Sequence, residues 1–240
     1  MEHELGEPMY STLDPSRTEK KPWRFLGESQ LSVLTNFTPG LLLFIIAAII
    51  DGAVHPYERD VADYSDGPTI SHPKLPQTVT ATQLYIYSWL LPPFLIALIC
   101  AARREWRLLH TSILGFVECA AINLFVTNFI KKSAGSLRPN FYAYCGWNGT
   151  QCNGPEAYVI SARQSFPSGH ASIAGAAMAY FSLFLIYTIE QSTKQVRQSA
   201  VSSSARIGAI FPVVFAIWIA ITRTIDYYHR FEVPASTLVS

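Results

Sequence analysis

The sequence predicts an all-α bundle of helices that crosses a membrane several times. Of the 240 residues, 50% are hydrophobic and only 15% are charged, whereas soluble domains carry about 25% charged residues. The apolar residues also gather in long stretches that are almost free of charge. Burying all of these stretches inside a soluble protein would need a core too large for this chain, so the pattern favours lipid as the solvent.

The apolar stretches define five predicted spans. A helix needs about 20 apolar residues to cross about 30 Å of hydrocarbon. Among Asp, Glu, Lys and Arg, Glu118 is the one residue inside these stretches. The last stretch is the shortest, and the long side chain of Arg206 can extend from its start toward the interface. The predicted spans lie within Ser29–Ile50, Leu75–Ala102, Leu108–Ile130, Gln164–Ile189 and Ile207–Thr222.

The spans belong to one predicted membrane domain, residues 29–230. Residues 1–28 are polar and mixed in charge, with no cleavable signal, and we interpret them as a cytosolic tail. Residues 231–240 are interpreted as a divergent C-terminal end. The prediction is therefore a multi-pass integral membrane protein, located in the plasma membrane, the endoplasmic reticulum or the Golgi.

The basic residues favour a cytosolic N-terminus. In that orientation the acidic 51–74 loop and the 131–168 loop are exoplasmic. Asn148-Gly149-Thr150 in the second loop is a glycosylation sequon, which is modified only on the lumenal side. The basic residues that this orientation places in cytosolic loops are Arg103, Arg104, Arg107, Lys194 and Arg197.

Cysteine placement is consistent with that orientation. Cys145 and Cys152 flank the sequon in the predicted exoplasmic loop, where oxidising conditions allow a disulfide. Two free thiols are the alternative. Cys100 and Cys119 lie within predicted spans and are interpreted as packing residues.

Three short clusters follow or precede spans at the predicted exoplasmic face. They are Lys131-x6-Arg138-Pro139, Pro167-Ser168-Gly169-His170 and Arg223-x5-His229. Each alone has an ordinary interpretation, namely interfacial anchors, a helix cap or a surface histidine. Arginine and lysine are, however, suited to phosphate oxygens, and exoplasmic cations run against the usual charge bias. Together the clusters indicate a site that binds and transfers a phosphoryl group.

The second and third clusters supply the reactive groups of this hypothesis. Ser168 is a predicted N-cap, and the helix start that follows it offers free N–H groups to an anion. Gly169 lets a phosphate oxygen approach the main chain. His170 is a candidate proton donor to a leaving alkoxide, and His229 is a candidate nucleophile.

These motifs resemble those of the type 2 phosphatidic acid phosphatase superfamily, also called lipid phosphate phosphatases. The resemblance implies a six-helix membrane enzyme that removes phosphate from membrane lipids at the exoplasmic face, with no metal, other cofactor or nucleic-acid partner. It implies that His229 forms a phosphohistidine and that His170 acts as acid and then as base. The residues that it assigns to phosphate binding are Lys131, Arg138, Ser168, Gly169 and Arg223.

The sequence departs from the family pattern near its end. Thr222 replaces the family's serine, and Val233 stands where an aspartate is expected to orient the nucleophile. Glu232 lies three residues after His229 and is the candidate substitute. The chain reaches Ser240 without the sixth helix, which leads us to expect a truncated splice form or a misread gene end.

Three alternative functions follow from the same residues. A catalytically impaired isoform would bind lipid phosphate or associate with full-length homologues as a homo- or hetero-oligomer. A vanadate-dependent haloperoxidase shares the phosphate cage, but five apolar spans argue against a soluble protein of that type. A transporter that uses the exoplasmic cations would move its substrate without releasing phosphate.

Overall fold

The computed structural model of the chain describes residues 30–61, 70–195 and 199–230. The contacts between Cα atoms divide the chain into two units, residues 1–35 and 36–240. Of the first unit, the described residues are the start of helix α1 (Gln30–Ala53). The predicted tail at 1–28 and the divergent end at 231–240, with Glu232 and Val233, lie outside the described residues.

The described residues of the second unit form helices and no strands, which confirms the all-α prediction. The elements after α1 are α2 (Ala81–Tyr85), the π-helical turn η5 (Ile86–Leu90), α3 (Leu91–Ala102), α4 (Trp106–Ala134), α5 (Phe141–Cys145), α6 (Glu156–Ala162), α7 (Gly169–Gln195), α8 (Ser199–Gly208) and α9 (Phe211–Ile225). Pro92 and Pro93 are the second and third residues of α3, just after the π-turn, and their missing N–H groups interrupt the α-helical bond ladder there.

Five helical stretches are long and apolar enough to cross a membrane, as predicted. They are Thr35–Ala53, Ala81–Ala102, Trp106–Ala134, Gly169–Ser192 and Ser203–Ile225. The second begins later than the apolar stretch that starts at Leu75. Thr80 and Gln83 form a capping box that starts the helix at Ala81, so residues 75–80 remain outside it.

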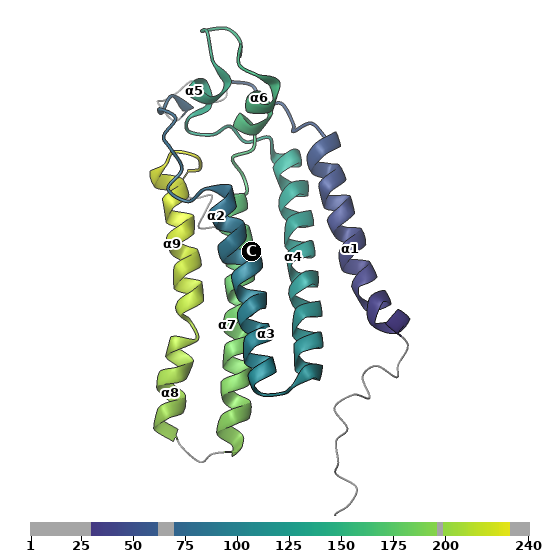
Figure 1. Cartoon of the computed structure of the whole chain (residues 1–240). Coiled ribbons are helices and arrows are strands. Elements are labelled where there is room, and N and C mark those ends of the chain that lie inside the picture. The colour runs from purple at the N-terminus through teal and green to yellow at the C-terminus, as the bar shows by residue number, and fades with distance from the viewer. Residues whose placement is uncertain (1–29, 62–69, 196–198, 231–240) are drawn as a thin grey trace, which may run out of the picture. The chain divides into compact units, whose positions relative to one another are not determined.

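Helix α7 packs against α9 and α4, and also contacts α3 and η5 (Figure 1). Buried residues of α7 such as Ala174 and Met178 meet Ile219 of α9 and Leu84 of α2 in one apolar cluster. Many large apolar side chains on the same helices stay exposed, for example Leu183 of α7. Exposed apolar faces of this kind suit a lipid environment.

Polar contacts join the described part of α1 to α4. The side-chain amide of Asn128 donates to the carbonyl of Ala47 at 3.1 Å. Lys132 donates to the carbonyl of Asp51 at 2.7 Å. Both bonds satisfy polar groups inside an otherwise apolar pair of helices.

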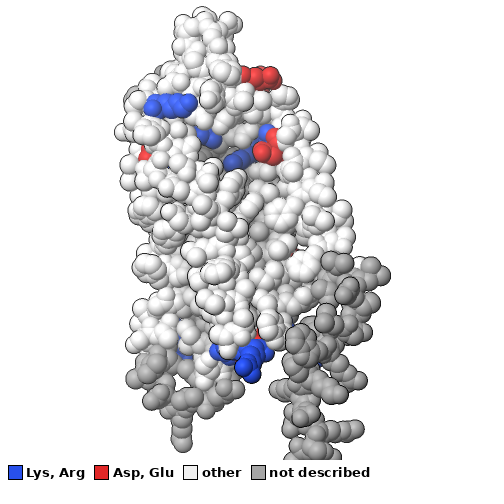
Figure 2. All heavy atoms as spheres, viewed as in Figure 1, with Lys and Arg blue, Asp and Glu red and all other residues white. Residues whose placement is uncertain are grey.

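Helices α5 and α6 lie together at the end of the bundle where α9 ends and α2 begins (Figure 1). Cys145 at the end of α5 and Cys152 are joined in a disulfide, with their Cα atoms 5.2 Å apart. On the face in Figure 2, Lys and Arg gather near the two ends, and the surface between them is almost free of charge. Charge at the ends and an apolar band between are what a spanning bundle requires.

Candidate active site

The first cluster lies where α4 ends and the chain turns back. Gly135 ends the helix in the left-handed conformation, with φ at 54°, and its N–H bonds to the carbonyl of Lys131 at 3.2 Å. A side chain at Gly135 would overlap the main chain of Tyr57. Both the positive φ and this close approach therefore require glycine.

The two lysines of the last turn of α4 have different surroundings. Lys132 is buried and bonded to Asp51. The amine of Lys131 lies against Gly169, the first residue of α7, because a Cβ built on Gly169 would come within 2.8 Å of Lys131 Nζ. Lys131 thus brings the first cluster into contact with the second.

Arg138 is held between aromatic rings. Its N–H bonds to the carbonyl of Ala162 at 3.0 Å, and its guanidinium carbon lies 5.4 Å from the ring centroids of both Tyr144 and Tyr228. Burial lowers the pKa of Arg138, while Tyr144 and Tyr228 act to raise it. An arginine remains protonated in such a setting, so Arg138 is a fixed cation.

The second cluster forms the start of α7 as predicted. Ser168 precedes the helix, and its Oγ accepts the N–H of Ala171 at 3.3 Å. The preceding peptide bond, Phe166–Pro167, is cis. Ser165, just before it, donates its N–H to the carbonyl of Ser136 at 2.8 Å. The segment that leads into α7 therefore lies beside the loop that carries Arg138.

A sharp turn after α9 builds the third cluster. Helix α9 ends at Ile225, and Tyr227 adopts the left-handed conformation with φ at 59°. The N–H groups of Tyr228 and His229 both bond to the carbonyl of Arg223, at 3.1 and 3.2 Å. The turn thus brings His229 back beside the residue with which the cluster begins.

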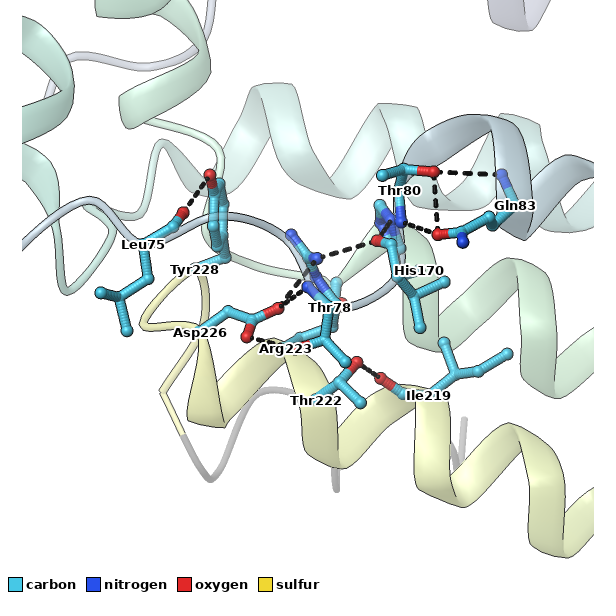
Figure 3. A network of polar contacts seen from close by, with 12 residues as sticks. Leu75, Thr78, Thr80, Gln83, His170, Ile219, Thr222, Arg223, Asp226 and Tyr228 are labelled. Carbon is cyan, nitrogen blue, oxygen red and sulfur yellow. Dashed lines mark hydrogen bonds and ion pairs between the residues drawn. The ribbon is translucent and has the colours of Figure 1, made fainter.

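Arg223 is almost completely buried, with 2% of its surface exposed. Its guanidinium carbon lies 4.5 Å from the centroid of the Tyr228 ring, the same ring that faces Arg138. Its Nη1 lies 3.8 Å from a carboxylate oxygen of Asp226 and donates to the carbonyl of Val79 at 3.4 Å (Figure 3). Tyr228 therefore brings two fixed cations to one place.

His229 is buried and makes a short hydrogen bond through Nδ1 to the carbonyl of Ser165, at 2.5 Å. A carbonyl can only accept, so the Nδ1 atom carries the proton, and Nε2 holds the lone pair. Burial lowers the pKa of His229 well below its usual value, and the charges of Arg138 and Arg223 lower it further. The ring is therefore neutral at physiological pH.

His170, in the first turn of α7, also bonds to a main-chain carbonyl. Its Nε2 lies 3.1 Å from the oxygen of Val79 (Figure 3). The same reasoning places the proton of His170 on Nε2. The two histidines thus present opposite tautomers, one with a lone pair on Nε2 and one with a proton there.

The three clusters all lie within residues 112–232, and this range matches the sequence profile of the PAP2 superfamily. The chain belongs to the PAP2 superfamily. The match confirms the family that the motifs indicated.

Relatives in the PAP2 superfamily include named phosphatases. Lipid phosphate phosphatase 1 of Arabidopsis thaliana is 30% identical over 206 residues, which cover 80% of this chain and 60% of the relative. Diacylglycerol pyrophosphate phosphatase 1 of Saccharomyces cerevisiae is 27% identical over 211 residues, covering 80% of this chain and 71% of the relative. The chain thus spans less than two thirds of the first of these relatives. No solved structure shows significant similarity to this chain.

The predicted PAP2 site residues of the three clusters converge at one end of the bundle. Of the predicted site residues, Glu232 alone lies outside the described residues.

The remaining predicted residues have the following surroundings. Asn148 is exposed, and its Oδ1 accepts the N–H groups of Thr150 and Gln151 at 3.0 and 2.9 Å. The hydroxyl of Thr222 bonds to the carbonyl of Ile219 at 2.7 Å. Within the described ranges, no three His, Cys, Asp or Glu side chains are grouped as a metal site.

Sequence analysis missed several residues around this PAP2 site. Asp226 and Tyr228 stand inside the Arg223-x5-His229 spacing, and each contacts Arg223. A carboxylate so close to a predicted span is costly unless it is paired, which was the available signal for Asp226. Thr78 and Val79 carry no motif, and nothing in the sequence indicates that they contact the clusters.

Proposed function

We propose that this PAP2 protein is an integral membrane phosphatase that hydrolyses lipid phosphate monoesters such as phosphatidic acid. The observation that carries the proposal is the hydrogen bond from His229 Nδ1 to the Ser165 carbonyl, which leaves the Nε2 lone pair in a site with three cations. The names of relatives, lipid phosphate phosphatase and diacylglycerol pyrophosphate phosphatase, support this class of substrate.

The phosphate group is bound by the fixed cations and by the start of α7. Lys131, Arg138 and Arg223 balance its charge, and arginine can bind two of its oxygens at once. The N-terminus of α7, where main-chain N–H groups favour an anion, adds to this binding, and Gly169 leaves room for a phosphate oxygen. Phosphoryl transfer depends mainly on such positioning and charge stabilisation.

In the first chemical step, His229 Nε2 attacks phosphorus and the ester P–O bond breaks. His170 acts here as the imidazolium, having taken a proton from the bound phosphate monoester on Nδ1, while its Nε2–H stays bonded to the Val79 carbonyl. The leaving alkoxide takes this Nδ1 proton and departs as the lipid alcohol, which leaves the His170 ring neutral. The Nδ1–H of the phosphorylated ring stays bonded to the Ser165 carbonyl, which supports the positive charge that the ring gains. A well-placed general acid accelerates such a step by about 10² to 10⁴.

In the second step, water attacks the phosphohistidine. His170, now neutral with a lone pair on Nδ1, takes a proton from the water as the P–N bond breaks. Inorganic phosphate takes this proton from His170 and is released, and both histidines return to their starting tautomers. Because the three cations supply the charge that metal ions supply in other phosphoryl transfer sites, we propose that no metal ion is needed.

We further propose that the site faces the lumen or the cell exterior. The exposed sequon at Asn148 follows α5, at the same end of the bundle as the clusters. A glycan there requires that this end be translocated. The cytosolic end would then be the one that carries Arg103, between α3 and α4.

A catalytically impaired protein that binds lipid phosphate is the second candidate. Val233 favours it, because the aspartate expected at this position orients the nucleophile. Disrupting such an orienting carboxylate in a triad hydrolase lowers turnover by about 10⁴. The Ser165 carbonyl favours the active phosphatase instead, because it already accepts the His229 Nδ1–H and so orients the ring.

The test is phosphate release from phosphatidic acid in detergent micelles containing EDTA. The proposal predicts turnover that persists in EDTA and is lost in His229→Ala. His55→Ala is the matched control, because His55 is exposed and outside the clusters. No turnover by folded protein that still binds inorganic phosphate would instead support the impaired isoform.

A further inference from the structure

One segment outside the three clusters contacts all of them. We refer to residues 72–79, which lie between α1 and α2, as the strap. Its first residue, His72, donates its N–H to the carbonyl of Pro139 at 3.0 Å. Leu75 accepts the Tyr228 hydroxyl at 3.1 Å, and Val79 accepts the His170 ring. The strap thus bonds to the first, third and second clusters in turn.

The strongest of these contacts is between Thr78 and Asp226, 148 residues apart. One carboxylate oxygen accepts the N–H of Thr78 at 2.8 Å, and the other accepts its hydroxyl at 2.7 Å (Figure 3). Asp226 is buried, with 4% of its surface exposed. Hydrogen bonds to an ionised group are about twice as strong as neutral ones, so this pair fixes the strap against the end of α9.

The residue next to Thr78 connects this pair to the proposed chemistry. The carbonyl of Val79 accepts both the Nε2–H of His170 and an Nη1–H of Arg223. Its position therefore decides which nitrogen of His170 carries the proton. It also holds Arg223 close to His170, and Asp226 balances the Arg223 charge from the other side at 3.8 Å.

We propose that Asp226 and Thr78 act as positioning residues for the phosphatase reaction, which makes the strap a fourth functional segment of this site. The inference rests on the proposed function. Neither residue touches the phosphate. Together they hold the Val79 carbonyl where it keeps one proton of His170 on Nε2, so that Nδ1 is the nitrogen that exchanges a proton with the leaving oxygen. Without them the carbonyl can withdraw, and His170 can carry its proton on the wrong nitrogen.

Two substitutions at Thr78 test this proposal with little change in volume. Thr78→Val removes the hydroxyl but keeps the N–H bond, and Thr78→Ser keeps both bonds. Thr80→Val is the matched control, because the Thr80 hydroxyl caps α2 and is bonded to Gln83 rather than to the clusters. Loss of a helix cap and loss of one hydrogen bond destabilise a protein by similar amounts, so the two valine variants should show similar falls in thermal midpoint.

The readouts are kcat and KM for phosphate release from phosphatidic acid, with the thermal midpoint of each variant. We expect Thr78→Val to lower kcat about tenfold, the loss of one bond to a charged group, and to leave KM within about threefold. Thr78→Ser should retain wild-type kcat, and Thr80→Val should lower the midpoint without lowering kcat. Equal kcat values in Thr78→Val and Thr80→Val would overturn the proposal.

Asp226→Asn provides a measurement that does not need turnover. The substitution removes the charge that balances Arg223, and we expect the affinity for inorganic vanadate to change by about fivefold or more. Unchanged affinity in folded protein would overturn the coupling between Asp226 and Arg223. If the wild-type chain binds vanadate but releases no phosphate, the proposed function is wrong, while this second measurement still decides whether Asp226 positions Arg223.

Discussion

His229 donates its Nδ1–H to the main-chain carbonyl of Ser165 across 2.5 Å, and this bond leaves Nε2 as the reactive nitrogen. Ser165 itself is fixed by the bond from its N–H to Ser136. The orienting acceptor is therefore part of the main chain that leads into α7. No carboxylate is needed to select this tautomer.

The first prediction concerns two residues that follow His229 in the sequence, Glu232 and Val233. Because the Ser165 carbonyl already orients the ring, Val233→Asp and Glu232→Gln should each change kcat by less than about threefold, equivalent to under about 1 kcal/mol. The measurement is phosphate release at saturating phosphatidic acid. A gain of several orders of magnitude in Val233→Asp would show that the expected aspartate is required and that the natural chain is impaired.

A second prediction concerns the contact between Gly169 and Lys131. A methyl group at position 169 would come within 2.8 Å of Lys131 Nζ, displacing the amine and occupying the approach of a phosphate oxygen. Gly169→Ala should therefore lower kcat/KM by about 10- to 100-fold, the loss of one or two bonds to a charged group. The lysine end is flexible, so the thermal midpoint should change little.

The matched control for that change is Gly52→Ala. A Cβ at Gly52, near the end of α1, meets no atom within 4 Å. Its kcat/KM should equal that of the wild type. Equal activity of both alanine variants would contradict the placement of phosphate at the start of α7.

The third prediction follows from the lowered pKa of His229. Burial, Arg138 and Arg223 lower this pKa well below 6.5, whereas the unfolded chain takes up the proton near pH 6.5. Below that pH the unfolded state binds more protons than the folded state. The free energy of unfolding should therefore decrease as the pH is lowered, until the folded-state pKa is reached. The slope from this residue is up to about 1.4 kcal/mol per pH unit.

Thermal unfolding in detergent from about pH 7.5 to about pH 5 measures this effect. His229→Asn should lose less stability than the wild type as the pH falls. The exposed His55 supplies the control, since His55→Asn should keep the wild-type slope. Parallel slopes for all three proteins would show that His229 is not buried in its neutral form.

The fourth prediction tests the orientation of the bundle. If the cluster end is lumenal, Asn148 should carry a glycan when the chain is expressed in eukaryotic membranes. Removal of the glycan by an endoglycosidase should increase gel mobility, and Asn148→Gln should abolish that shift. Asn36 stands in a second sequon but lies inside the first span, so Asn36→Gln should leave the shift unchanged. An unmodified Asn148 would contradict the proposed face.

The spans and the convergence of the clusters were predictable because each depends on local pattern. Apolar length fixes the helices that can cross a membrane, and alternating topology then places Lys131, Ser168 and Arg223 at one end. The N-cap at Ser168 follows from residue type alone. Motifs near the ends of spans are thus well suited to sequence analysis.

The connections between the clusters could not be predicted in this way. The strap joins Thr78 to Asp226 across 148 residues, and neither residue lies in a periodic pattern. Tyr228 faces Arg138 and Arg223 because Tyr227 takes a left-handed conformation. A left-handed conformation at a residue other than glycine is uncommon and is not predicted by the sequence. The difference between Lys131 and Lys132 likewise depends on where α1 and α7 pack, since adjacent residues lie on different helix faces.

The covalent intermediate gives the most direct test of the proposed nucleophile. The chain would be mixed briefly with phosphatidic acid labelled in its phosphate, stopped under alkaline denaturing conditions that preserve the P–N bond, and analysed by peptide mass spectrometry. We predict one phosphoryl group on His229 and none in His229→Gln, which should also release no phosphate. Label on another residue, or wild-type turnover in His229→Gln, would contradict His229 as the nucleophile.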